Sequence, residues 1–264
     1  MPAQQVDPLI PWLMGRTAAT TFYLPSADYI WPHVLNRKVR EAVVAHGGTI
    51  VGDEYFPMDH TDYVDTVEKI IASGADVVFT TIVPPGLTPF LELLHKAGFT
   101  ARGGSIVCTY FDENFSNLVP AAHVEGLYSC LDYYQAIGES FSADLLARYD
   151  SRFPGTAMFT AGSACTGLYR GLKPWEAAVD EAGSLDQREV IRALDHARIA
   201  AGPGGAAEMV PGQHHVRMNM YIAQARNGHF EIVNELGMIE PKEAVVGDGR
   251  DAAGVRSVRE AATA

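Results

Sequence analysis

The 264-residue sequence has few basic residues and no long apolar run. Its 20 Lys and Arg are outnumbered by 32 Asp and Glu, so the formal net charge is −12 at pH 7. Binding to nucleic acid or to an anionic membrane surface needs a positive field, and we therefore expect no nucleic-acid partner. No stretch reaches the roughly 18 consecutive apolar residues of a membrane span, so we expect no membrane insertion.

Cysteine is scarce as well, with Cys108, Cys130 and Cys165 as its three occurrences. They show no CxxC spacing, and no Cys/His cluster has the spacing of zinc ligands. We expect three buried or half-buried thiols and no metal. His214 and His215 would occupy successive positions of a strand, whose side chains point to opposite faces, so they cannot easily ligate one metal.

Motifs of the common enzyme classes are also missing. The sequence contains no GxSxG elbow, no GxGxxG after a strand and no P-loop. Its paired carboxylates, Asp53-Glu54 and Asp112-Glu113, have no evident acid–base partner in the sequence. The glycine-rich run 202–205 precedes an expected strand rather than a helix, unlike a phosphate-binding loop. We expect neither catalysis nor a cofactor.

The first 16 residues lack the features of a signal peptide. They have no basic n-region, and their apolar part is short and interrupted by Pro8 and Pro11. If the chain as written is the whole product, this absence favours a cytoplasmic location.

The sequence is rich in alternating strand-like and helix-like segments. Runs of β-branched and aromatic residues predict strands at 20–24, 49–56, 77–82 and 105–108. Between them, apolar residues recur at helical spacing, and Gly47, Gly74 and Gly98 follow where helices should end. This alternation specifies parallel βαβ units with helices on both faces of the sheet. We predict a doubly wound parallel α/β lobe from residue 17 to about 128.

The pattern changes after residue 128. Helical spacing appears at 138–149, 157–182 and 186–196, with no strand pattern between these segments. Alternating strands follow at 206–210, 216–224 and 229–233, and Asn227-Gly228 is a strong hairpin signal. The helices need a sheet to cover, and the sequence supplies none for them. The tail, 241–264, is rich in Gly, Ala and charge, and we expect it to be flexible.

Ligands of such lobes bind beyond the carboxyl ends of the strands. The loops at those ends, 26–31, 80–86 and 109–112, are rich in Thr, Ser and aromatic residues and poor in basic ones. They suit a small polar ligand that accepts hydrogen bonds and stacks on rings. The candidate ligand-binding residues are Ser26, Asp28, Tyr29, Trp31, Thr81, Val83, Thr109 and Tyr110. Alternatively, Ser26 and Asp28 suit a turn or an N-cap. Tyr29 and Trp31 would then pack the loop against a neighbouring lobe.

Several phrases in one order resemble a known family. They are SADYIWP, GGTIVGDEYFPMDHTDY, ADVVFTTIVPPG, VEGLYSCLDYYQ and HHVRMNMYIAQARNGHFEIV. They resemble the amide- and urea-binding branch of the type I periplasmic binding proteins, the substrate-binding components of branched-chain amino acid and amide ABC transporters. The same branch includes a cytoplasmic amide sensor. The resemblance runs from about residue 4 to residue 241.

The resemblance implies two α/β lobes joined by three crossing strands. Residues 1–128 with 206–240 would form the second lobe, and 129–205 would be the returning helices of a first lobe that lacks its sheet. The apolar helix faces near Leu145, Leu168 and Trp175 would then be exposed. They predict a homodimer, a missing partner segment or a sticky monomer.

The resemblance also implies a function. Two lobes would close over a small-molecule solute, an amide, urea or an amino acid, and an ABC permease would be the partner of this periplasmic protein. The alternatives are a cytoplasmic sensor read by a regulatory partner, and a truncated, non-binding remnant. Family members use an aromatic of the SADYIWP phrase to cover the ligand, which implies that role for Tyr29. Tyr110 and Phe111 are bulkier than the family's usual residues there, so the ligand stays open.

Overall fold

A nine-stranded sheet organises the part of the chain that the computed structural model describes, residues 1–154 and 160–242. Its order is β2-β1-β3-β4-β5-β8-β7-β6, and β9 also pairs with β8. The first five strands are parallel, whereas β8 is antiparallel to its neighbours. The parallel strands are β1 (Thr21–Ala27), β2 (Thr49–Phe56), β3 (Val77–Phe79), β4 (Ser105–Val107) and β5 (Tyr128–Leu131).

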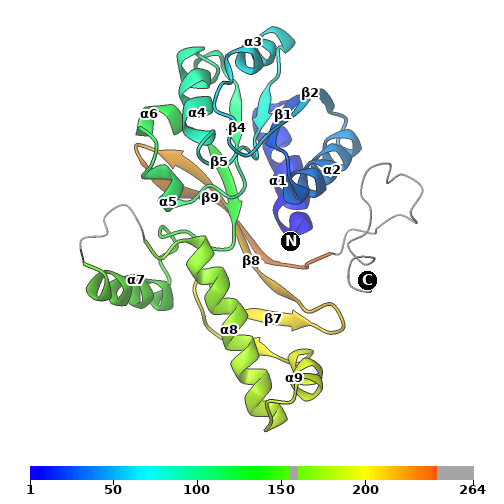
Figure 1. The fold of residues 1–264 in the computed structure, drawn as a ribbon, viewed down its shortest axis with the longest axis vertical. Helices are drawn as coiled ribbons and strands as arrows, with labels where there is room; N and C mark the ends of the chain where they lie inside the picture. The colour runs from blue at the N-terminus through cyan, green and yellow to red at the C-terminus, as the bar shows by residue number, and fades with distance from the viewer. Residues whose placement is uncertain (155–159, 243–264) are drawn as a thin grey trace.

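Helices cover both faces of the parallel strands (Figure 1). One apolar layer lies between the sheet and α3 and α4, and the other lies between the sheet and α1 and α2. The helices of this part are α1 (Pro2–Thr17), α2 (Ile30–Ala45), α3 (Val64–Ser73), α4 (Leu87–Lys96), the short α5 (Glu113–Ser116) and α6 (Ala121–Val124), with a 3-10 turn at Thr100–Arg102. The prediction of a doubly wound parallel lobe is confirmed. We call residues 1–131 the α/β part.

The predicted helix ends follow from glycine. Gly47, Gly74 and Gly98 all have positive φ, at 79°, 67° and 68°, just after α2, α3 and α4. A left-handed residue there ends the helix at no steric cost to glycine. The four predicted strands are present, but β1 extends to Ala27 and β3 ends at Phe79.

Helix α1 and strand β5 were not predicted, nor were the short helices α5 and α6 and the 3-10 turn. Helix α1 continues through Pro8 and Pro11, each of which costs about 3 kcal/mol in a helix interior. Its apolar face offsets that cost, because four side chains are fully buried and each contributes roughly 1.5–3 kcal/mol. These are Val6, Leu9, Ile10 and Leu13. Strand β5 lies between β4 and β8, buried along its whole length.

The second part of the chain is mostly helical and lies below the parallel strands in Figure 1. We call residues 132–214 the helical part. It contains α7 (Ser140–Arg152), α8 (Ser163–Ala182), α9 (Gln187–Leu194), β6 (Arg198–Ile199) and β7 (Ala207–Val210). Among its described residues no strand lies between β5 and β6, as the sequence predicted. Residues 155–159, which include the first residues of the predicted helix 157–182, and most of the predicted flexible tail, 243–264, lie outside the described residues.

One long hairpin connects the two parts. Strand β8 (His215–Arg226) pairs with β7 through its first residues and with β5 through its last ones, while β9 (His229–Ile239) runs along its other edge. The predicted Asn227-Gly228 turn joins β8 to β9, with φ of 50° and 81° at the two residues. Both values are the left-handed ones that a two-residue hairpin turn requires. The assignment of these segments to two lobes stays a prediction.

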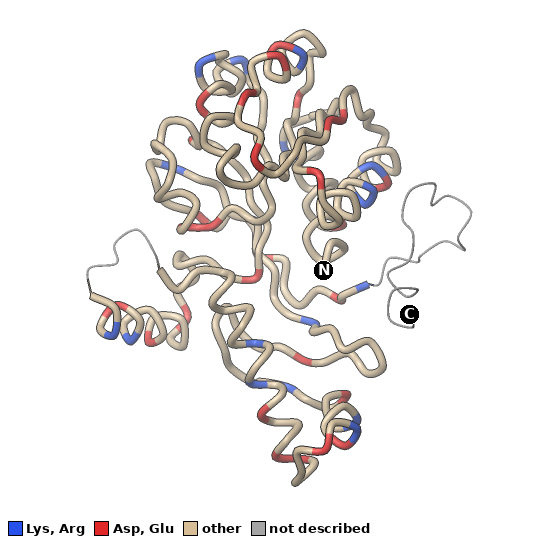
Figure 2. Tube along the Cα trace, in the orientation of Figure 1, with Lys and Arg blue, Asp and Glu red and all other residues tan. Residues whose placement is uncertain are grey.

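Acidic and basic residues are interspersed along the chain. Figure 2 shows both kinds on the outer helices, with no long run of basic residues in the described part of the trace. Within the described ranges, none of the helices combines the length and the apolarity of a membrane-crossing segment.

The three thiols differ in accessibility. Cys108 and Cys130 are buried in the core, where desolvation raises the pKa of each thiol to about 12. Cys165 on α8 is exposed, so the expectation of three buried or half-buried thiols was wrong for this residue.

We expect one of these three thiols to react with a thiol reagent in the native protein at pH 8, and all three after denaturation. The thiolate is the reactive form, and burial suppresses it at the other two positions. A colorimetric thiol titration measures the count. Cys165→Ser should remove the native signal; two or more native equivalents would contradict the buried placement of Cys108 and Cys130.

Candidate ligand-binding site

The carboxyl ends of β1, β3 and β4 lie side by side, because these strands are neighbours in the sheet. Past the end of β3, Thr81 forms a single bridge with Ser26, and its backbone N–H donates to the carbonyl of Pro25 at 3.2 Å. Thr80 Oγ1 donates to the same carbonyl at 3.1 Å. The structure therefore brings the first two predicted loops into direct contact. We call this edge of the sheet the rim.

A row of aromatic rings runs along the rim. The ring centroids of Tyr29 and Trp31 are 6.1 Å apart, those of Trp31 and Tyr110 5.7 Å, and those of Tyr110 and Phe115 4.9 Å. The Tyr110 hydroxyl donates to the carbonyl of Ile82 in the middle loop. The row thus joins all three predicted loops. Tyr29, Trp31 and Tyr110 are half-buried, so part of each ring faces solvent.

The rim also includes three hydroxyl side chains. Ser26, Thr81 and Thr109 are fully buried. Ser26 Oγ accepts a hydrogen bond from Asn36 Nδ2 at 2.7 Å, but the hydroxyls of Thr81 and Thr109 have no partner within the described part of the chain. An unpaired buried hydroxyl costs roughly 1–3 kcal/mol. These two threonines are therefore unpaired buried polar groups at the rim.

Asp28 and Val83 lie at the margin of the rim. Asp28 is exposed, and its Oδ1 lies 2.8 Å from Nε2 of His33. The His33 ring stacks on Tyr55 at the end of β2. The structure does not bring Asp28 into the row of rings. Its alternative role as an N-cap is wrong too, because the N-cap of α2 is Tyr29, which makes no side-chain capping bond. Val83 is half-buried in the loop after β3.

The row of rings and the three rim hydroxyls include no charged side chain, and the carboxylate of Asp28 lies at the margin of the rim. Desolvation raises the pKa of Tyr29, and burial raises the pKa of Tyr110 well above its ordinary value, so both phenols keep their protons. The rim therefore offers neutral O–H groups and ring faces rather than a counter-charge for a strongly anionic group.

The loop after β4 also connects to the helical part, which the sequence did not reveal. Asp112 caps α5 through the N–H of Asn114 at 3.0 Å and accepts from the N–H of Ser163, the first residue of α8, at 3.0 Å. Glu113 accepts from the backbone N–H of Gln135 at 2.8 Å. Asn114 is a local partner, but Ser163 and Gln135 lie 51 and 22 residues away, beyond the reach of local sequence patterns.

Burial of Glu113 gives a pH-dependent stability. Desolvation raises the pKa of this carboxyl from 4.5 to about 7 in the folded protein. The unfolded chain then loses the proton first, so stability falls as pH rises from about 4.5 to 7 and stays lower above that range.

Glu113→Gln removes this cost while keeping an amide oxygen to accept from Gln135. We expect the variant to be more stable than the parent at pH 8, by about 1–3 kcal/mol, with little gain at pH 4.5. Urea denaturation at the two pH values measures the difference. Glu41→Gln, at an exposed position of α2, is the matched control; an equal gain at both pH values would refute the titration of Glu113.

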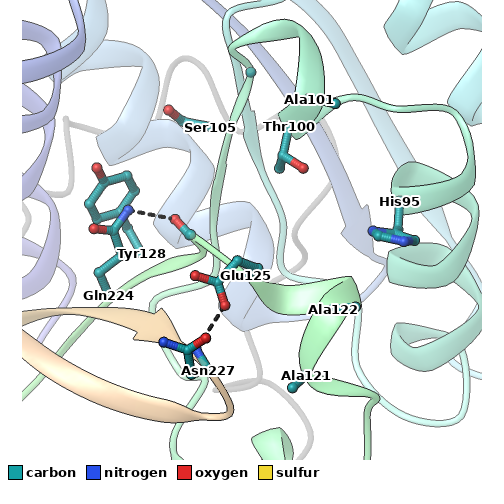
Figure 3. A pocket seen from close by; sticks show the side chains of 12 residues that line it. His95, Thr100, Ala101, Ser105, Ala121, Ala122, Glu125, Tyr128, Gln224 and Asn227 are labelled. Carbon is teal, nitrogen blue, oxygen red and sulfur yellow. Dashed lines mark hydrogen bonds between the residues drawn. The ribbon is translucent and has the colours of Figure 1, made fainter.

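A separate open pocket of about 830 Å3 lies at the opposite edge of the sheet (Figure 3). Ser105 and Tyr128, at the starts of β4 and β5, are among its lining residues. Two of its polar side chains already have partners: Gln224 Nε2 donates to the carbonyl of Gly126 at 3.0 Å, and Glu125 accepts from the N–H of Asn227 at 2.8 Å. The rim therefore remains the better candidate site.

A family model described as "Periplasmic binding protein" matches residues 1–229. The chain belongs to the periplasmic binding protein family. The resemblance to the type I periplasmic binding proteins of ABC transporters is thereby confirmed. The family consists of non-catalytic solute-binding proteins, which agrees with the lack of enzyme motifs.

Solved structures of the same fold are similar over most of this chain. A solute-binding protein of an ABC transporter from Rhodopseudomonas palustris BisB5, in complex with 3,4-dihydroxybenzoic acid, has 19% identity and a TM-score of 0.77 over 91% of this chain and 65% of its own. An amino acid ABC transporter substrate-binding protein from Pseudomonas fluorescens Pf-5 has 16% identity and a TM-score of 0.76, with coverages of 91% and 64%.

A third neighbour is a branched-chain amino acid ABC transporter periplasmic ligand-binding protein from Burkholderia xenovorans LB400. It has 16% identity and a TM-score of 0.68 over 88% of this chain and 62% of its own. This periplasmic binding protein therefore spans less than two thirds of the length of these structures, and they support its fold.

Proposed function

We propose that the rim is one wall of a cleft in which this periplasmic binding protein holds a small polar solute for an ABC permease in the periplasm. The row formed by Tyr29, Trp31 and Tyr110 carries the proposal, because it joins the three strand-end loops into one half-exposed aromatic surface. Flat rings with neutral hydroxyls nearby suit a planar, uncharged group. We assign the solute to small amides, urea or the uncharged end of an amino acid.

A benzoate-type acid is the second candidate. The neighbour from Rhodopseudomonas palustris was crystallised with such a ligand, and an aromatic acid could stack on the same row of rings. Its carboxylate would need a cation or N–H groups from elsewhere, because the row of rings and the rim hydroxyls include no Lys or Arg. This requirement ranks it below the amides on the wall described here.

We further propose that the opposite wall belongs to a first lobe, of which α7, α8 and α9 are the returning helices. The outward side of α8 supports this division, because Leu168 is 66% and Trp175 48% exposed. Leu145 of α7 is half-buried. More than a third of each neighbour's length has no counterpart here, enough for the strands that such helices would cover.

Calorimetric titration with acetamide, urea, leucine and 4-hydroxybenzoate tests the proposal, with light scattering to define the oligomeric state. We expect this chain to bind an amide or amino acid only weakly, because one wall leaves the solute partly in water. A monomer that binds one of them at micromolar affinity would contradict the missing wall. If a two-lobed homologue, which has both walls of the cleft, bound none of these four compounds, the proposed solute class would be contradicted. Binding without any effect on transport would favour the sensor alternative.

A further inference from the structure

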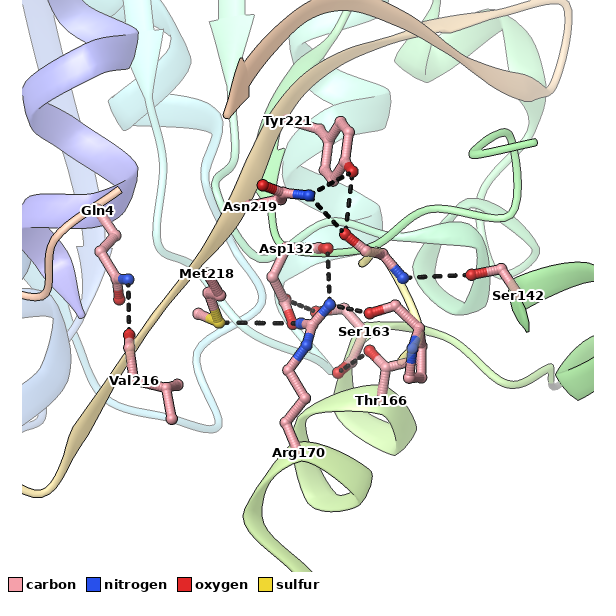
Figure 4. Close-up of polar contacts among 12 residues, drawn as sticks. Gln4, Asp132, Ser142, Ser163, Thr166, Arg170, Val216, Met218, Asn219 and Tyr221 are labelled. Carbon is pink, nitrogen blue, oxygen red and sulfur yellow. Dashed lines mark hydrogen bonds and ion pairs between the residues drawn. The ribbon is translucent and has the colours of Figure 1, made fainter. Parts of the chain in front are cut away.

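Helix α8 buries its arginine and exposes its leucines. Arg170 is 3% exposed, whereas Leu168 and Leu172, two residues to either side, are 66% and 55% exposed. A surface helix normally shows the reverse pattern. The buried side of α8 faces the place where the α/β part continues into the helical part, and there Arg170 finds its partners (Figure 4).

The Arg170 guanidinium contacts three segments that are far apart in the sequence. It forms an ion pair with Asp132, directly after β5, and donates to the backbone carbonyl of the same residue at 3.3 Å. It also donates to the carbonyl of Pro203, between β6 and β7, and contacts Met218 Sδ of β8 at 3.8 Å. Ser163 Oγ, at the start of α8, donates to Asp132 Oδ1 at 3.0 Å.

The turn that contains Pro203 is shaped for this contact. Gly204 has φ of 73°, and a Cβ there would lie 2.3 Å from the carbonyl oxygen of Asp132 and 2.6 Å from Arg170 Nη2. The Gly204 carbonyl accepts from the Tyr221 hydroxyl of β8 at 3.0 Å, and its N–H donates to Ser142 Oγ of α7 at 3.2 Å. The turn is therefore fixed between α7, α8 and β8.

The α/β part holds the same connecting hairpin from its other side. Gln4 of α1 donates to the carbonyls of Val216 in β8 at 3.0 Å and Ile239 in β9 at 2.9 Å. Gln4 thus contacts β8 at Val216 and Arg170 contacts it at Met218, each from a different part of the molecule (Figure 4). A relative rotation of the two parts must therefore bend β8 between these two contacts or break one of them.

We propose that Arg170 is a positioning residue that sets the angle between the helical part and the α/β part, by fastening α8 to the segment after β5, the turn at 202–205 and β8. The significance of this angle for solute capture rests on the proposed function, since the rim is one wall of a cleft whose other wall moves with α8. Loss of the guanidinium fork would free the helical part to sample several angles.

The test measures the angle directly, without a ligand. Cysteines replace Glu41, exposed on α2, and Leu185, exposed after α8, in a Cys165→Ser background, and spin labels at both sites report their separation by pulsed electron paramagnetic resonance. We expect one narrow distance distribution for the parent and a distribution about twofold broader, or split, for Arg170→Gln. Arg170→Lys should be intermediate, because it keeps the charge and loses the fork.

A matched variant separates positioning from ordinary destabilisation. Ala178 is buried between α8 and α9, away from the three segments, so Ala178→Gly should lower the melting temperature and leave the distribution narrow. A narrow distribution in Arg170→Gln, or equal broadening in Ala178→Gly, would overturn the proposal. The readout needs no solute, so a failure to bind any solute would contradict the proposed function and leave this result standing.

Discussion

An Asp132→Ala variant is expected to lose about 3–5 kcal/mol of unfolding free energy, the range found when one partner of a buried ion pair is removed. Asp132 is 8% exposed and Arg170 3%. Burial lowers the pKa of Arg170 only to about 10, so the guanidinium would remain charged at neutral pH without its carboxylate partner. A buried charge that has lost its ionic partner destabilises the folded state.

A double-variant cycle in urea denaturation measures this effect. Asp132→Asn combined with Arg170→Met removes both charges, so we expect it to be more stable than Asp132→Ala alone. Asp144→Ala, at an exposed position of α7, is the matched control and should change stability by less than about 0.5 kcal/mol. A loss below about 1 kcal/mol in Asp132→Ala would mean that the pair does not form in solution.

Replacing Tyr29 with alanine is expected to weaken solute binding by roughly 1–3 kcal/mol, or about 5- to 150-fold. The ring is half-buried at the start of α2 and continues the row through Trp31. Its loss would remove the outer end of the aromatic wall. Calorimetric titration measures the change in affinity. It uses a two-lobed homologue that carries the same substitution, and a solute that this homologue binds.

Two further variants define what Tyr29 contributes. Tyr29→Phe keeps the ring and should retain most of the affinity if stacking dominates, whereas a loss equal to that of alanine would point to the hydroxyl. Tyr149→Ala, on α7 and remote from the rim, controls for the general loss of a tyrosine. Unchanged affinity in Tyr29→Ala would remove this residue from the site.

Local patterns in the sequence predicted most of the α/β part. Apolar runs predicted the buried strands, helical spacing of apolar residues predicted the helices, and glycines such as Gly74 predicted the helix ends. These signals can be recognised in the sequence because each depends only on residues a few positions apart. The rim could be predicted for the same reason: in a parallel sheet the loops after successive strands must gather at one edge. The local patterns could not predict that Ser26, Thr81 and Thr109 are fully buried.

One missed element shows what local patterns cannot predict. Helix α1 was missed because its two prolines are unfavourable locally, while the burial that compensates for them depends on packing against α2 and the sheet. Asp28 was a different case: it was a candidate ligand-binding residue with an N-cap as the alternative, and the structure pairs it with His33, five residues further along the chain.

The sequence by itself determined the alternation of strands and helices, the parallel βαβ units of the α/β part, the aromatic and Lys/Arg-poor character of its rim loops and the family. Only the tertiary structure decided which polar groups are buried and with whom they pair. Arg170 lies among apolar neighbours on α8, and nothing within that helix indicates burial, because Asp132 and Pro203 are 38 and 33 residues away. An ion pair of this kind forms only once the chain has folded, since long-range contacts supply both the desolvation and the compensating charge.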